Sequence, residues 1–300
     1  MVEIRVPATS ANMGAGFDTM GIALNIYNRI KVSETESGLK IVNIGSSEYI
    51  PTNENNLIYK SVVRVFDEVG YKKRGLKIVQ NSDIPMTRGL GSSSACIIGG
   101  LLAGNHISGN KLSREELLCL ATEAEGHPDN VVPAMYGGFC VSASEGGNIY
   151  HKSFKISPKL KYAVMIPDYF AATKKSRGIL PDTVPFKDAA FNVSRAAWFA
   201  ASMVGGNFNN LKIGAEDRLH QPYRKSYVEG MEEIFAKSYE LGAKAVFLSG
   251  SGPAVVAVLE EDTEYFKDNI TEFFEKFSHK RQCKIVEIDN VGAVVKIVRH

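Results

Sequence analysis

Pro85-Met-Thr-Arg-Gly-Leu-Gly-Ser-Ser-Ser-Ala95 links a short β-forming run at 75–80 to an apolar, small-residue stretch that extends to about residue 104. The first run predicts a strand and the second a buried helix, so a glycine loop opens a helix. Unpaired N–H groups in the first turn and the positive end of the helix dipole favour an anion at such a place. The segment therefore predicts a phosphate-binding loop, in which a serine hydroxyl can also ligate the magnesium bound to a nucleotide.

A serine-capped helix that follows a turn is the alternative interpretation of this segment. Glycine and serine are both common around helix starts, so the loop composition by itself does not separate the two interpretations. The segment also differs from two better-known phosphate motifs. The chain contains no G-x-x-x-x-G-K-[ST], and this loop lacks the third glycine of G-x-G-x-x-G.

The rest of the chain mixes strands and helices in both halves. Residue periodicity predicts strands at 2–6, 21–33, 75–80, 137–143, 148–154, 161–166, 244–249 and 253–259, and a terminal hairpin at 283–298. It predicts helices at 55–69, 95–104, 113–126, 188–204, 225–240 and 262–277, and a loop at 12–18. This pattern indicates an α+β protein. We place a domain boundary near residue 155, between residues 1–155 and residues 156–300.

Local signals support several of these elements. Ser113 and Glu116 have the spacing of a capping box, in which each side chain accepts a hydrogen bond from the other residue's backbone N–H. Glu145-Gly-Gly-Asn148 has the composition of a tight hairpin turn. Trp198 and the apolar face of the helix at 188–204 are expected to pack into the core, as large apolar side chains at helical spacing usually do.

The composition limits the functional class. With 300 residues, 44% of them hydrophobic, the chain can bury a large core. Lys and Arg outnumber Asp and Glu by only 35 to 33, so no global field attracts nucleic acid or a membrane surface. The four scattered cysteines have no C-x-x-C spacing, and the N-terminal residues lack a signal-peptide pattern. We therefore expect a cytoplasmic protein with a small-molecule partner and with neither nucleic acid nor membrane as a partner.

Three segments resemble, in order and separation, the motifs of the galactokinase, homoserine kinase, mevalonate kinase and phosphomevalonate kinase (GHMP) superfamily. They are Pro7-Ala-Thr-Ser-Ala-Asn-Met-Gly-Ala-Gly-Phe-Asp18, Pro85-Met-Thr-Arg-Gly-Leu-Gly-Ser-Ser-Ser-Ala95 and Phe247-Leu-Ser-Gly-Ser-Gly-Pro-Ala254. The resemblance spans essentially the whole chain. It implies a two-domain small-molecule kinase fold with an α+β, nucleotide-binding N-terminal domain, a ferredoxin-like C-terminal domain, and ATP and Mg²⁺ as cofactors. The glycines of Ser249-Gly-Ser-Gly-Pro253 are then expected to support the phosphate loop by close packing.

A fourth segment, Glu125-Gly-His-Pro-Asp-Asn-Val-Val-Pro133, resembles homoserine kinases. Taken alone, it is typical of a helix that ends at Gly126 and of a turn in which His127 and Asp129 only cap backbone groups. Together with the three motifs, it implies phosphorylation of the L-homoserine hydroxyl to O-phospho-L-homoserine, a step of threonine biosynthesis.

Two other interpretations stay open. One is a mevalonate- or shikimate-type kinase of the same superfamily, and the other is a nucleotide-binding regulator without turnover. Asp18 favours an amino-acid acceptor, because neither mevalonate nor shikimate has an ammonium group to pair with it. The sequence does not determine the oligomeric state, and a homodimer is one of the states that it allows.

The resemblance also implies the ligand contacts of individual residues. Nucleotide binding is assigned to Pro85, Met86, Thr87, Arg88, Gly89, Leu90, Gly91, Ser92, Ser93, Ser94, Ala95 and Thr173. Substrate binding is assigned to Asn12, Asp18, His127, Arg177 and Arg224. The two arginines suit a carboxylate, because a guanidinium group can pair with both of its oxygens. Ser93 and Glu125 offer the hard oxygen ligands that Mg²⁺ prefers.

Catalytic roles are implied for Asn130 and Arg177, beside the transferring phosphate, and for Asp129. Asp129 is the only motif carboxylate near Asn130 that could act as a base. Homoserine kinases look instead like enzymes without a dedicated base. Phosphoryl transfer depends mainly on positioning and electrostatics, so a strong base is not required.

Overall fold

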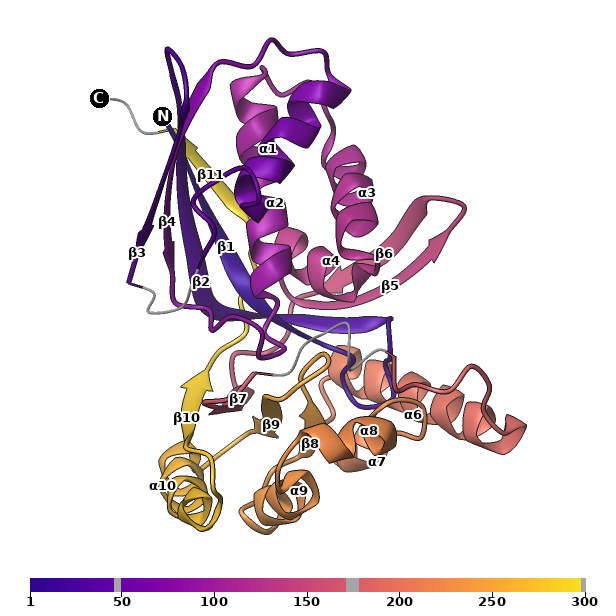
Figure 1. Ribbon diagram of the computed structural model, residues 1–300. Helices are drawn as coiled ribbons and strands as arrows, with labels where there is room; N and C mark the ends of the chain where they lie inside the picture. The colour runs from indigo at the N-terminus through magenta and orange to yellow at the C-terminus, as the bar shows by residue number, and fades with distance from the viewer. Residues whose placement is uncertain (46–49, 171–177, 298–300) are drawn as a thin grey trace.

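The computed structural model describes residues 1–45, 50–170 and 178–297. These residues form two β-sheets, one of seven strands and one of four, with helices packed against both sheets (Figure 1). Two of the residues with a predicted role, Thr173 and Arg177, lie outside the described residues. Each helix of the described part is too short or too polar to cross a lipid bilayer.

The larger sheet is built mainly by the N-terminal half of the chain. Its order is β11-β1-β2-β4-β3, with β5 paired to β2 and β6 paired to β5. Along the start of β1, buried Val2, Ile4 and Val6 alternate with more exposed side chains, so that one face of the sheet is apolar. The strands are β1 Val2–Ala11, β2 Met20–Thr35, β3 Leu39–Ile44, β4 Gly75–Ser82, β5 Phe139–Glu145, β6 Asn148–Phe154 and β11 Val294–Ile297.

Four helices cover the apolar face of this sheet (Figure 1). They are α1 Leu57–Glu68, α2 Ser92–Ile107, α3 Arg114–Glu125 and α4 Pro128–Tyr136. Helix α2 is buried on nearly all sides, and its small residues let α1 come close. A Cβ atom at Gly100 would lie 2.5 Å from the carbonyl oxygen of Ile58. The predicted capping box between Ser113 and Glu116 is confirmed at the start of α3.

The smaller sheet has the order β10-β7-β9-β8, and all of its pairs are antiparallel. Along the chain its elements run strand, helix, strand, strand, helix, strand. This connection and this strand order are those of a ferredoxin-like domain, as expected. The strands are β7 Lys161–Pro167, β8 Ala245–Leu248, β9 Val255–Leu259 and β10 Arg281–Val286, and the helices are α6 Phe186–Gly205, α7 Leu211–Ala215, α8 Gln221–Arg224, α9 Met231–Glu240 and α10 Thr263–Phe273, with 3₁₀ turns η1 Lys225–Tyr227 and η2 Phe274–Lys276.

Both faces of the smaller sheet are buried, which joins the two halves of the molecule. Ala163 and Met165 of β7 pack with α9 and α10 in a cluster of their own. The alternate residues of β7, such as Tyr162 and Val164, belong to the main core that also contains β1 and α2. Successive strand residues point to opposite faces, so one apolar strand can serve two cores.

The terminal hairpin that we expected at 283–298 is wrong. Strand β10 pairs with β7 in the smaller sheet, whereas β11 pairs with β1 in the larger one. Between them the chain runs along β2, where the Asn25 N–H donates to the Glu287 carbonyl (2.9 Å) and the Asp289 N–H donates to the Ala23 carbonyl (2.9 Å). The boundary near residue 155 stays a prediction, and the last strand lies in the larger sheet.

Three further elements differ from the sequence expectations. The stretch after Gly126, which by itself is typical of a turn, forms helix α4 with Pro128 in its first turn, where a missing N–H costs nothing. The parallel strand β3 was not expected. The helix expected at 225–240 begins only at Met231, because α8 and η1 precede it as separate short turns.

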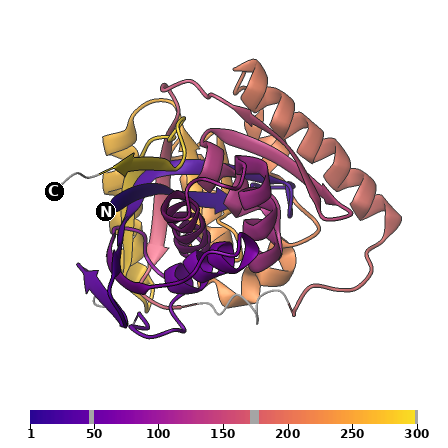
Figure 2. The same cartoon turned by 90° about the horizontal axis from the view of Figure 1, so that it is seen from above.

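Helix α6 lies at the periphery of the molecule in both views (Figure 1, Figure 2). Only Asn192, Phe199 and Met203 of this helix are buried. Trp198 is 46% exposed and donates its indole N–H to the Asn210 carbonyl at 3.2 Å. The expectation that Trp198 packs into the core is therefore wrong, because Phe199 and Met203 form the buried side of α6 instead.

Candidate active site

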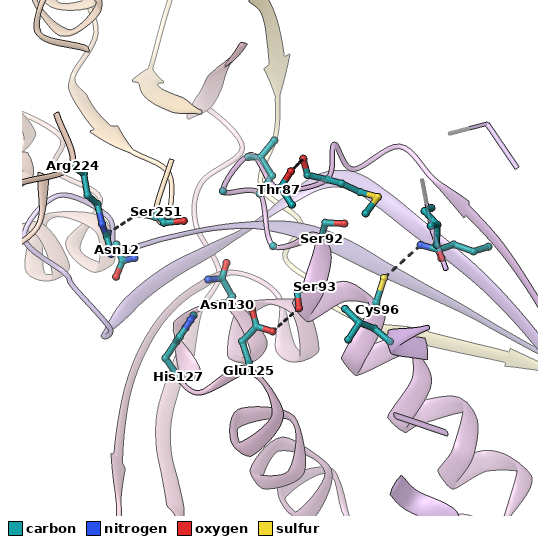
Figure 3. Close-up of a pocket in the computed structure, with 18 residues that line it drawn as sticks. Asn12, Thr87, Ser92, Ser93, Cys96, Glu125, His127, Asn130, Arg224 and Ser251 are labelled. Carbon is teal, nitrogen blue, oxygen red and sulfur yellow. Dashed lines mark hydrogen bonds between the residues drawn. The ribbon is translucent and has the colours of Figure 1, made fainter. Parts of the chain in front are cut away.

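A cavity of about 340 Å³ lies between the N-terminal end of α2 and the smaller sheet (Figure 3). Many of the residues assigned from sequence line it together: Asn12, Met86, Thr87, Gly89, Leu90, Gly91, Ser92, Ser93, Glu125, His127, Asn130 and Arg224. Segments far apart in sequence thus supply one site. The lining includes residues from the loop after β1, the glycine loop, the α3–α4 corner and α8.

The glycine loop has a backbone that only glycine tolerates at two positions. Thr87, Gly89 and Gly91 all have positive φ angles, of 53°, 77° and 67°. A Cβ atom at Gly89 would lie 2.1 Å from the Ser249 carbonyl oxygen, and one at Gly91 would lie 1.9 Å from Oγ1 of Thr9. Gly91 is the N-cap of α2, and no side-chain hydrogen bond from this residue caps the helix. The free N–H groups and dipole of the first turn suit a phosphate.

The third motif holds this loop in place. The Ser249 hydroxyl donates to the Gly89 carbonyl at 2.6 Å, and the Ala254 N–H donates to the Arg88 carbonyl at 3.2 Å. The Gly250 N–H donates to the Ala11 carbonyl at 2.8 Å, which also ties the motif to the end of β1. This arrangement agrees with the expectation that the segment supports the phosphate loop by close packing.

Arg88 belongs to the loop but does not line the cavity. Its Nε donates to the Pro167 carbonyl at 3.1 Å and its Nη2 donates to the Asp168 carbonyl at 3.3 Å. The guanidinium group thereby anchors the base of the loop to the end of β7. Five more assigned positions, Asp18, Pro85, Ser94, Ala95 and Asp129, also lie outside the lining.

Glu125 faces the serines of the loop. Its two carboxylate oxygens accept hydrogen bonds from the Ser93 hydroxyl (2.9 Å) and the Ser94 hydroxyl (3.0 Å). Neighbouring ligand oxygens of an octahedral magnesium ion lie about 2.9 Å apart, because each is about 2.0–2.1 Å from the ion. The separation of the Ser93 and Glu125 oxygens is that of an ordinary hydrogen bond, and it is also compatible with two ligand oxygens of one magnesium ion.

The loop after β1 forms the opposite wall. Asn12 and Asp18 both have positive φ angles, of 57° and 52°, and the Asn12 amide oxygen accepts from the Asp18 N–H at 2.8 Å. Carboxylate and imidazole atoms of Asp18, His127 and Asp129 all lie within 4.8 Å of one another. This concentration of acceptors suits an ammonium group as well as it suits a metal ion.

The first turn of α4 orients two neighbouring polar residues differently. Asn130 lines the cavity, and its amide oxygen accepts from the Thr9 hydroxyl at 2.7 Å, which fixes the amide plane. The Asp129 side chain is 0% exposed, and its carboxylate contacts Nδ1 of His127. His127 thus lies between Asp129 and the cavity.

Arg224 supplies a buried cation at the far end of the cavity. The residue is 2% exposed, and Nη1 donates to the Gly250 carbonyl at 3.0 Å and to Nδ1 of His220 at 3.1 Å. The guanidinium carbon lies 5.4 Å from the centre of the Phe17 ring. Both hydrogen bonds of Nη1 go to uncharged acceptors.

Several lining residues were not assigned from sequence, namely Ile50, Leu57, Gln80, Cys96, Gly250 and Ser251. Gly250 and Ser251 belong to the third motif, whereas Cys96 lies on α2 just beyond the glycine-loop motif. Burial raises the pKa of its thiol to about 11, and the Sγ atom accepts from the amides of Asn28 and Gln80 at 3.5 Å each. The Cys96 side chain is therefore a neutral thiol that forms part of the cavity wall and does not act as a nucleophile.

Comparison with known proteins identifies an N-terminal and a C-terminal kinase domain in this chain and relatives that match its full length. The family model of the GHMP kinases N terminal domain matches residues 56–138, and that of the GHMP kinases C terminal matches residues 196–276. A homoserine kinase from Caldicellulosiruptor saccharolyticus is 46% identical over 297 residues, which cover 98% of this chain and 96% of the relative. A homoserine kinase from Clostridium botulinum is 43% identical over 295 residues, which cover 98% of each protein.

Solved structures agree at the level of the fold. The crystal structure of homoserine kinase from Cytophaga hutchinsonii matches with a TM-score of 0.89 at 25% identity, covering 98% of this chain and 97% of that one. The crystal structure of L. major mevalonate kinase in complex with R-mevalonate matches with a TM-score of 0.72 at 17% identity, covering 95% and 94%. From the family models and the full-length relatives, the chain belongs to the GHMP kinases and, among them, to the homoserine kinase family.

Proposed function

We propose that the protein transfers the γ-phosphoryl group of ATP to the side-chain hydroxyl of L-homoserine. The observation that carries this proposal is a pair of opposite charges beside the phosphate loop. Arg224 lines the cavity and offers a cation for a carboxylate. Asp18 lies outside the lining but within 4.8 Å of His127, which lines it, and offers an anion for an ammonium group. The product is O-phospho-L-homoserine, a precursor of threonine. The mevalonate- and shikimate-type alternatives leave the Asp18 carboxylate without a partner from the substrate.

The reaction forms one bond to phosphorus and breaks one, and the acceptor hydroxyl loses its proton to solvent. The acceptor hydroxyl oxygen bonds to the γ-phosphorus, the bond from that phosphorus to the β–γ bridging oxygen breaks, and ADP and the hydroxyl proton leave. Charge spreads over the moving group, so residues that hold and orient it do most of the catalysis. In our proposal the first turn of α2 binds phosphate, and Asn130 orients the acceptor hydroxyl. Predictions for Thr173 and Arg177 stand as made from the sequence.

Mg²⁺ belongs to the same proposal. Ser93 and Glu125 would hold the ion, because a hydroxyl and a carboxylate are hard oxygen ligands that Mg²⁺ prefers. When bound, the ion neutralises charge on the transferring phosphates. The Glu125 carboxylate also keeps the serine hydroxyls of the loop turned toward this position.

The burial of Asp129 argues against a direct role as a base. Its carboxylate is fully buried and contacts the imidazole of His127, so any proton from the acceptor hydroxyl would reach it through that ring. We propose that Asp129 chiefly orients His127 and that transfer needs no dedicated base. Without a dedicated base, the site relies on Asn130 and on the charges around the transferring phosphate.

Turnover with magnesium–ATP against homoserine, serine, threonine, mevalonate and shikimate tests the proposed function. We expect homoserine to be preferred by tenfold or more in kcat/KM, because only homoserine places carboxylate, ammonium and hydroxyl groups at this spacing. A tenfold preference for another acceptor would reassign the substrate. ATP binding without turnover of any acceptor would favour the regulator instead.

Helix α6 supports a homodimer as the working form. From residue 190 to residue 204 its exposed positions are uncharged: Ala190, Val193, Ser194, Ala197, Trp198, Ala201 and Val204. A second copy of the same face can meet it across a two-fold axis without repulsion between like charges. The alanines would also allow two helices to pack closely.

Sedimentation tests this assembly. We expect the wild-type protein to have about twice the 32.8 kDa mass of one chain, and Val193→Lys to sediment as the monomer because it places two like charges near the axis. Tyr265→Lys, which changes an exposed residue of α10, is the matched control and should remain dimeric. A monomeric wild type, or a dimeric Val193→Lys variant, would contradict the proposal. The expectations of a cytoplasmic location, and of neither nucleic acid nor membrane as partner, stay predictions.

A further inference from the structure

His220 is a buried histidine that no sequence motif marked. It immediately precedes α8, its side chain is 0% exposed, and it does not line the cavity. Its Nδ1 lies 3.1 Å from Nη1 of Arg224, and its Nε2 lies 2.8 Å from the carbonyl oxygen of Gly14. The imidazole thus bridges Arg224 to the loop that carries Asn12 and Asp18, two places separated by about 200 residues in sequence.

The two contacts assign the proton of this imidazole. A guanidinium group can only donate hydrogen bonds, so Nδ1 of His220 must accept from Arg224. The proton is then on Nε2, which donates to the Gly14 carbonyl. Protonation of Nδ1 would set two donors against each other. Burial, together with the nearby Arg224, lowers the pKa of His220, although Asp217 opposes this change.

Asp217 holds the backbone from which His220 projects. One carboxylate oxygen accepts from the backbone N–H groups of His220 (3.0 Å) and Gln221 (2.7 Å). The other accepts from the Leu219 N–H (2.9 Å) and from the Asn192 side chain (2.7 Å). Oδ2 of Asp217 is 3.5 Å from Nε2 of His220, farther than the Gly14 carbonyl, so the ring proton goes to Gly14.

The loop on the other side of His220 is equally constrained. Gly14 has a φ of 56°, and a Cβ atom there would lie 2.6 Å from Cα of Ala215. The Phe17 ring stacks on the His220 ring, with centroids 5.4 Å apart and an interplanar angle of 27°. The guanidinium group of Arg224 lies over the same Phe17 ring. Loop, imidazole and guanidinium therefore form one packed unit behind the cavity.

We propose that His220 is a positioning residue that couples the two ends of the acceptor site. Its Nδ1 sets the guanidinium group of Arg224 toward the substrate carboxylate, and its Nε2–H holds the loop that presents Asn12 and Asp18 to the substrate ammonium group. This inference rests on the proposed function, because it assigns the two ends of the site to the two charged groups of homoserine.

Two amide substitutions separate the two contacts. The amide oxygen of Asn can take the place of Nδ1, whereas the amide nitrogen of Gln can take the place of Nε2. His220→Gln therefore loses the acceptor for Arg224, and we expect KM for homoserine to rise about fivefold while kcat and KM for ATP stay within about twofold. Homoserinol, which lacks the carboxylate, should be unaffected. His220→Asn keeps that acceptor but releases Gly14, and it should weaken homoserine and homoserinol alike.

Further measurements exclude a merely structural role. His151→Gln, at a half-buried histidine of β6 outside the cavity, should leave both Michaelis constants unchanged even if it lowers the melting temperature. In an Arg224→Lys background, His220→Gln should raise KM for homoserine no further. Melting-temperature losses with unchanged KM for homoserine in both His220 variants would overturn the proposal.

A measurement on the unmodified protein keeps the proposal testable if the variants do not fold. Nitrogen-15 chemical shifts of the imidazole at pH 7 should report a neutral ring protonated on Nε2. A ring protonated on Nδ1, or on both nitrogens, would refute the assignment. Turnover of homoserine by the wild-type protein is measured in parallel. If turnover is absent while the His220 ring is still protonated on Nε2, the proposed function fails and the assignment of the imidazole proton does not.

Discussion

Glu125→Gln is expected to lower kcat about a hundredfold or more, with little change in KM for homoserine. Glutamine keeps the size of the side chain and can still accept from the Ser93 hydroxyl, but it removes the negative charge. A neutral amide is a much poorer ligand for a hard divalent ion, so the charge on the transferring phosphates is less well neutralised. Steady-state kinetics at increasing magnesium should show partial recovery of turnover.

The same helix offers a matched control for this change. Glu123, two residues earlier on α3, is exposed and pairs with Arg64 at 3.0 Å on the outer surface. Glu123→Gln should leave turnover and its magnesium dependence unchanged, since exposed ion pairs contribute at most about 1 kcal/mol to stability and this one does not line the cavity. If Glu125→Gln behaves like this control, Glu125 has only a structural role.

Arg224→Lys is expected to raise KM for homoserine by about tenfold to a hundredfold. Lysine keeps the charge but loses the planar fork, so it cannot hold the Gly250 carbonyl and also present two parallel donors to a carboxylate. A charged group that loses such a hydrogen bond in a desolvated site costs about 1–3 kcal/mol. The Michaelis constant for ATP should change much less, because the nucleotide phosphates are assigned to the first turn of α2.

Homoserinol and a surface arginine provide the controls. Homoserinol has a hydroxymethyl group where homoserine has its carboxylate, so its KM should hardly respond to Arg224→Lys. Arg218→Lys changes an exposed arginine that pairs with Asp188 at 2.9 Å, and it should leave all constants unchanged. Equal weakening of homoserine and homoserinol by Arg224→Lys would mean that Arg224 holds the fold rather than the carboxylate.

Elements that depend on a few neighbouring residues were predicted well from the sequence. The capping box of Ser113 and Glu116 starts α3 as expected. The hairpin turn between β5 and β6 has positive φ angles at Gly146 and Gly147, of 57° and 83°. In each case the signal and the structure that it specifies lie within four residues, so no distant partner can overrule it.

The residues that line the site were predicted in part from family motifs and not from local structural signals. Asn12, Glu125 and Arg224 were assigned through the family motifs, and they do meet in one cavity. Arg88 carries the same kind of assignment, yet its side chain anchors the loop to β7. A motif specifies which residue types are present, whereas the direction of each side chain depends on the neighbours that the fold supplies.

The sequence by itself determined a glycine loop at the start of a buried helix, an α+β chain and membership of one kinase family. Only the tertiary structure decided that the last strand joins the larger sheet, that Trp198 and its apolar neighbours on the outer side of α6 are exposed, and that His220 bridges Arg224 to Gly14. The physical reason is the range of the interactions. Periodicity and turn residues report contacts within about one or two helical turns. The contacts of β11, α6 and His220 depend on residues far away in sequence, and no local pattern encodes which of several apolar or polar partners will be adjacent.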